Sequence, residues 1–104
     1  MVIGLRADRV ADYKRLHAAV WPGVLETMRR NDWRNFDIFI KEPENLLFGT
    51  FEYHGDDFAA SGRAIAADGE TQRWWRECEP CQQPLSTVKP GEWWAMMDNI
   101  FHMD

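Results

Sequence analysis

Apolar and polar residues alternate over the middle of the chain in a way that predicts two strands. The segment 35–41 places Phe36, Ile38 and Ile40 on one face, as expected for a strand with one buried side. The turn residues 42–45 separate it from a second strand-like run at 46–53, so the two runs predict a β-hairpin. Gly49, inside the second run, indicates a bulge or a close approach of backbone or ligand.

Helical patterns lie on both sides of this hairpin. Asp8 is a candidate N-cap for a helix that continues to about residue 20, and Pro22 is suited to begin a second helical segment that closes at 31–32. After the hairpin, residues 54–57 cap an alanine-rich helix through about Ala67, and residues 70–78 predict a further helix that Pro80 ends. We expect a loop over 82–91 and a final strand over 92–102, although the periodicity of this last segment would also admit a short helix.

With a short apolar strand at Val2–Leu5, the order is strand, broken helix, strand, strand, broken helix, strand. This order predicts an α+β domain of the ferredoxin-like, split βαβ type, with a four-stranded antiparallel sheet and helices on one face. The length of 104 residues suits one domain, 1–104. Because the other face of such a sheet is open, we expect a homodimer of the dimeric α/β-barrel type.

Charge and composition narrow the possible partners. The net charge of −5 argues against nucleic acid or an anionic membrane as the main partner. The sequence has no apolar run of membrane-spanning length and does not begin like a signal peptide, so the expected location is cytoplasmic.

Tyr13 and His17 are four residues apart in the first predicted helix and therefore project from the same side. An imidazole titrates near neutral pH and can pass a proton to and from an oxygen atom, with the phenol binding the same ligand. Trp21 follows on that side. On spacing alone, however, a histidine packed in the core is the more common explanation.

Trp74 and Trp75 are adjacent, so in a helix their side chains diverge by about 100°. One of them can pack while the other faces a cavity or a partner, although packing of both is the simpler interpretation. Cys78 and Cys81 have C-x-x-C spacing but follow a helical segment instead of opening one, which favours ordinary thiols over a redox pair. The sequence holds no phosphate-binding loop or dinucleotide fingerprint, and we predict no cofactor and no metal.

Six segments together resemble the L-rhamnose mutarotase family, in the same order and at similar spacings. They are Tyr13–His17, Val20–Pro22, Asn35–Phe39, Asn45–Phe48, Gln72–Trp75 and Ile100–His102. The resemblance implies a ferredoxin-like dimer and a cofactor-free isomerase that interconverts the α and β anomers of a 6-deoxy-L-hexose. It implies His17 as the proton donor, with Tyr13, Trp74 and Trp75 binding the monosaccharide, and it makes Trp21 a further candidate.

One position departs from the family pattern. Phe36 stands where the family often has a second sugar-binding tyrosine, so a hydroxyl contact would have to come from elsewhere, for example Asn35 or Tyr53. This departure leaves L-rhamnose and L-fucose both open as substrates. Two other functions share the fold order: a non-catalytic ligand-binding dimer and a cofactor-free oxygenase of the dimeric α/β-barrel type.

Overall fold

The computed structural model describes all residues, 1–104, and contains one antiparallel sheet of four strands. The strands are β1 (Val2–Leu5), β2 (Trp33–Lys41), β3 (Leu46–Tyr53) and β4 (Gln82–Gln83), and their order in the sheet is β2-β3-β1-β4. All three pairings are antiparallel. This is the ferredoxin-like order that the sequence predicts, and the predicted α+β fold is confirmed.

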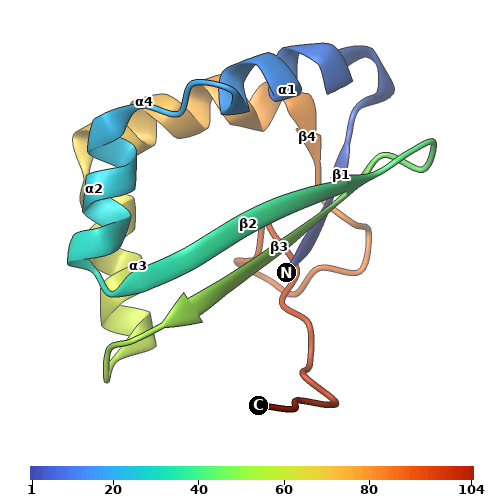
Figure 1. Cartoon of the computed structure of the whole chain (residues 1–104). Helices are drawn as coiled ribbons and strands as arrows, with labels where there is room; N and C mark the ends of the chain where they lie inside the picture. The colour runs from blue at the N-terminus through green and yellow to red at the C-terminus, as the bar shows by residue number, and fades with distance from the viewer.

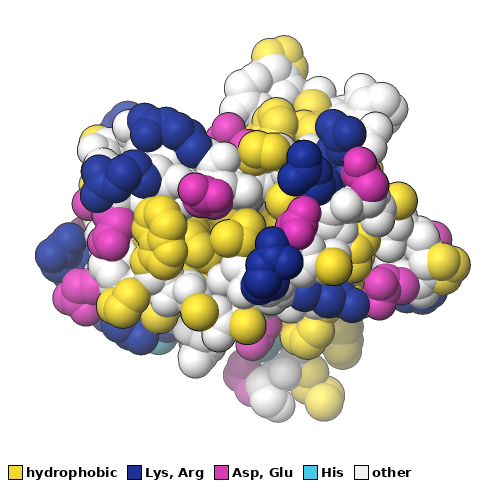
Figure 2. All heavy atoms as spheres, turned by 90° about the horizontal axis from the view of Figure 1, so that it is seen from above, with side chains coloured by type: hydrophobic (Ala, Val, Ile, Leu, Met, Phe, Trp, Pro, Cys, Tyr) yellow, Lys and Arg dark blue, Asp and Glu magenta, His cyan; other side chains and the backbone are white.

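The helices gather on one side of the sheet (Figure 1). They are α1 (Val10–His17), α2 (Pro22–Arg30), α3 (Phe58–Ala67) and α4 (Gly69–Cys78), with two 3-10 turns, η1 (Ala7–Arg9) and η2 (Glu79–Cys81). Seen from above, the helical side carries Lys and Arg interspersed with Asp and Glu around small apolar areas (Figure 2). None of the helices combines the length and the apolar character that a membrane crossing requires.

Local capping explains where most of the helices begin. The carboxylate of Asp57 accepts a hydrogen bond from the Ala60 N–H, and that of Asp68 accepts one from the Thr71 N–H, as N-cap residues do. Pro22 occupies the first position of α2, as predicted. The N-cap prediction for Asp8 is wrong, because Asp8 lies inside η1 and the chain enters α1 without a side-chain cap.

The prediction for the last strand is also wrong. The fourth strand is Gln82–Gln83, inside the segment expected to be a loop, since η2 delivers these residues directly beside Gly4 and Leu5 of β1. Only Ala95 of the predicted strand 92–102 joins the sheet, through a single bridge to Val2. Residues 96–104 then leave the body of the molecule (Figure 1).

The β-hairpin agrees with the sequence except in the position of its irregularity. Phe36, Ile38 and Ile40 are partly buried, whereas Asn35, Asp37 and Phe39 on the other face are exposed. The register shift lies between Arg34 and Asp37, where Asn35 has a positive φ of 49°. Gly49 is instead a site of close approach, because a Cβ there would lie 3.0 Å from the Met1 side chain.

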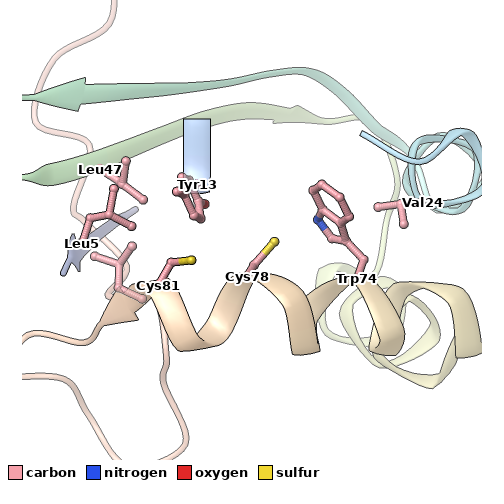
Figure 3. Packing of buried hydrophobic residues seen from close by; sticks show 8 residues of the cluster. Leu5, Tyr13, Val24, Leu47, Trp74, Cys78 and Cys81 are labelled. Atoms are coloured by element: carbon pink, nitrogen blue, oxygen red, sulfur yellow. The ribbon is translucent and has the colours of Figure 1, made fainter. Parts of the chain in front are cut away.

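The core lies between the sheet and the helices. Ile3 and Leu47 pair across β1 and β3 and are almost completely buried. Figure 3 shows Trp74 and Cys78 pointing from α4 toward the strands, with Tyr13 from α1 between them and Leu47. The burial of Tyr13 beside these residues brings α1 into the region that carries the predicted chemistry.

Candidate functional site

A cavity of about 560 Å³ lies where the helices face the sheet. Fifteen of its nineteen lining residues are hydrophobic, and the polar ones among them are His17, Thr71, Glu79 and Gln82. Its size and its apolar walls with a few polar groups are typical of a small-molecule site. The predicted residues Tyr13, His17, Phe36, Trp74 and Trp75 all line it.

His17 ends α1, and its position and tautomer are fixed by the preceding turn. Its Nδ1 lies 3.0 Å from the carbonyl oxygen of Tyr13, and a carbonyl can only accept, so Nδ1 must carry a hydrogen. Its ring stacks on the Tyr13 ring at a centroid distance of 4.1 Å, and the Trp74 ring approaches edge-on at 5.3 Å. Burial lowers the pKa of His17, so near neutral pH the imidazole is neutral and its Nε2 is a free proton acceptor.

Tyr13 belongs to a second polar contact that the sequence does not reveal. The Gln82 amide donates a hydrogen bond of 3.2 Å to the Tyr13 hydroxyl, and the Gln82 carbonyl oxygen accepts one of 2.7 Å from the Trp93 indole. Burial raises the pKa of Tyr13 well above its usual value, so the phenol stays protonated. Tyr13 can therefore act at this site as a hydrogen-bond donor, and not as an anionic base.

The adjacent tryptophans of α4 divide between the core and the surface. Trp74 is 5% exposed, and Trp75 is 38% exposed. Trp21, which does not line the cavity, packs edge-on against Trp74 at a centroid distance of 5.3 Å. The divergence of adjacent helical positions thus produces one packed indole and one partly open indole, both reaching the same cavity.

Part of the cavity wall is aromatic and lies near the start of β2, where Trp33 and Phe36 line it. Trp33 stacks on Phe51 at 3.9 Å and on Phe36 at 5.5 Å, and the Trp33 indole N–H is buried without a hydrogen-bond partner. Asn35 does not line this wall, because its exposed amide bonds the carboxylate of Glu52 on the other face. Tyr53 is also committed elsewhere, since its hydroxyl bonds Ser61 and the Asp57 N–H.

The two thiols are buried and unreactive in character. Cys78 is 4% exposed and Cys81 is 3% exposed, and both are free. Burial raises the pKa of Cys78 to about 12, helped by the neighbouring Cys81, which is the opposite of what a redox or nucleophilic cysteine requires. This agrees with the interpretation of the C-x-x-C pair as ordinary packed thiols.

The structure adds residues that sequence reasoning missed. Gln82, Trp33, Trp93 and Trp94 all line the cavity. The chain contains six tryptophans, and their number alone does not indicate which indoles line a cavity. No sequence signal marks Gln82, because its contact with Tyr13 spans 69 positions.

Fold and cavity together define a small ferredoxin-like α+β protein with a neutral histidine and a tyrosine in an aromatic pocket. The family model described as rhaM, L-rhamnose mutarotase, matches residues 1–103. The L-rhamnose mutarotases of Yersinia pestis (strain Pestoides F) and Yersinia pseudotuberculosis (serotype O:1b) are each 32% identical over 75 residues, which is 72% of this chain and 69% of theirs.

A solved structure agrees with these matches in its fold. The crystal structure of an L-rhamnose mutarotase from Formosa agariphila superposes with a TM-score of 0.77 at 23% identity, covering 99% of this chain and 94% of that one. The chain belongs to the L-rhamnose mutarotase family, and mutarotases are isomerases.

Proposed function

We propose that this protein is a mutarotase that interconverts the α and β pyranose anomers of a 6-deoxy-L-hexose. The observation that carries the proposal is the pairing of a neutral His17, with Nε2 free, and the Tyr13 hydroxyl in a largely apolar cavity. L-Rhamnose is the first candidate substrate, because the matched relatives are named for it, and L-fucose is the second.

The chemistry needs one group that moves a proton in both directions. Ring opening breaks the bond between C1 and the ring oxygen, removes the proton from the anomeric hydroxyl and adds a proton to the ring oxygen. Both oxygens are bonded to C1, so one imidazole can take the proton from the first and deliver it to the second. After rotation about C1–C2, the same transfers in reverse close the other anomer.

The cavity walls suit the sugar proposed. A 6-deoxy-hexose has an apolar side that includes its methyl group, and flat aromatic side chains pack against such surfaces. We assign this binding role to Trp74, Trp75 and Phe36, which all line the cavity, with Trp21 supporting Trp74 from behind. Phe36 offers no hydroxyl, so at this wall the sugar is recognised by apolar contact.

Anomer exchange measured by saturation-transfer NMR of the anomeric protons tests the proposal directly. We expect the protein to accelerate exchange of L-rhamnose or L-fucose, and to have little effect on D-glucose, which lacks the methyl group. Failure to accelerate exchange of any 6-deoxy-L-hexose would remove the proposed function. Tight retention of a sugar without faster exchange would instead support a non-catalytic binding protein.

We also infer that the protein works as a homodimer. The segment after Ala95 exposes large apolar side chains, and on the outer face of the sheet Phe39 is 58% exposed. The exposed residues of the segment are Met96, Met97, Ile100, Phe101 and Met103. Such apolar surface is unfavourable in water, and a second copy of the chain can cover it. A cytoplasmic location stays a prediction.

Light scattering after size exclusion tests the dimer. We expect about twice the chain mass of 12.2 kDa for the full protein, and a smaller species when residues 96–104 are removed. A monomeric full-length protein at micromolar concentration would contradict the inference.

A further inference from the structure

The hydrogen-bond chain from Trp93 through Gln82 to Tyr13 joins three residues that all line the cavity. The central residue, Gln82, is a polar side chain only 8% exposed. A buried amide costs free energy unless both of its ends are bonded, and here both ends have partners.

The chain has a fixed direction. An indole N–H can only donate, so the Gln82 atom facing Trp93 must be the carbonyl oxygen. The amide nitrogen therefore faces Tyr13, and because that nitrogen can only donate, the phenol oxygen must accept. The hydrogen of the Tyr13 hydroxyl is left without an acceptor in the protein, on a residue that lines the cavity.

We infer that Gln82 is a positioning residue that, oriented by Trp93, makes Tyr13 an obligatory hydrogen-bond donor to the ring oxygen of the sugar. The inference rests on the proposed function. Among the oxygens of a pyranose, the ring oxygen alone carries no hydrogen, so it can only accept and is the natural partner for a group that can only donate. His17 is the opposite case, an acceptor. Its Nδ1–H is bonded to the Tyr13 carbonyl, so only its Nε2 is left to face the sugar, and that nitrogen accepts.

In ring opening, the donor Tyr13 and the acceptor His17 first act on different oxygens of the sugar. His17 Nε2 takes the proton of the anomeric hydroxyl, while the Tyr13 hydroxyl donates a hydrogen bond to the ring oxygen as the C1–O bond breaks and negative charge develops there. His17 then delivers the same proton to the ring oxygen, and Tyr13 keeps its own hydrogen. A donor held in place before the reaction stabilises that charge without reorganising. Gln82 does not touch the reacting atoms and acts only through Tyr13.

The test is a double-substitution cycle on the rate of anomer exchange. Gln82→Met keeps the length of the side chain and removes both hydrogen-bonding groups, and it should lower the exchange rate per enzyme about tenfold. In a Tyr13→Phe background the same change should have no further effect, because the hydroxyl through which Gln82 acts is gone. A packing role for Gln82 would give the same loss in both backgrounds and would overturn the inference.

A second variant tests the direction of the chain. Gln82→Glu preserves the shape, but its carboxylate accepts from both neighbours and would capture the Tyr13 hydrogen. We therefore expect Gln82→Glu to exchange anomers more slowly than Gln82→Met. An exchange rate equal to that of the parent protein would overturn the inference.

Two further variants guard against misfolding and unspecific effects. Trp93 is 42% exposed, so Trp93→Phe should fold and should still lower the rate a few-fold by releasing the Gln82 carbonyl. Gln83→Glu, on the exposed next position of β4, is the matched control and should keep the parent rate. If the parent protein accelerates anomer exchange, and Trp93→Phe and Gln82→Met exchange anomers at the same rate as the parent, this inference fails and the proposed function stands.

Discussion

Replacing His17 with asparagine should lower the enzyme-dependent rate of anomer exchange by at least about 100-fold. Asparagine can still donate to the Tyr13 carbonyl from the position of Nδ1, so the end of α1 is preserved. What disappears is Nε2, the group that carries the proton between the two oxygens on C1. The rate is measured by saturation-transfer NMR, after the spontaneous exchange of the free sugar has been subtracted.

The matched control is His54→Asn, since the side chain of His54 is exposed and its ring bonds only Glu52, near the end of β3. It should exchange anomers at the parent rate. The parent protein should also keep its rate to a pH below 6.5 and lose it only as His17 becomes protonated, because burial lowers the pKa of that side chain. Exchange by His17→Asn at the parent rate would remove His17 from the mechanism.

Replacing Trp74 with alanine should lower the free energy of unfolding by about 3–5 kcal/mol. Trp74 is 5% exposed and contacts the rings of His17 and Trp21, so its loss opens a hole between α1, α2 and α4. Such a loss is a large share of the total stability of a domain of this size. Urea unfolding followed by circular dichroism measures it.

Trp75 provides the comparison, because it is the adjacent residue with the same side chain. At 38% exposure it has less packing to lose, so Trp75→Ala should cost about 1 kcal/mol. Its main effect should be weaker sugar binding, since its indole forms part of the cavity wall. Equal destabilisation by the two substitutions would show that the two indoles do not divide between core and cavity as described.

Local patterns were sufficient to predict the hairpin, the helix start at Pro22, the capping of the next helix within 54–57, and the common face of Tyr13 and His17. Each of these depends on residues within a few positions of one another, where chain geometry alone sets the neighbours. The last strand could not be predicted in this way. A two-residue strand has no period, and whether 82–83 or 92–102 pairs with β1 depends on where η2 places the chain.

The sequence by itself determined the ferredoxin-like order of elements, the family resemblance and the identity of the histidine and tyrosine most worth testing. Only the tertiary structure decided that the Tyr13 hydroxyl meets Gln82 and that Trp93 orients that amide. The physical reason is that a hydroxyl or an amide can orient in more than one way, and its hydrogen-bond partner sets whether it donates or accepts. Here the partners come from segments that only the folded sheet and helices bring together.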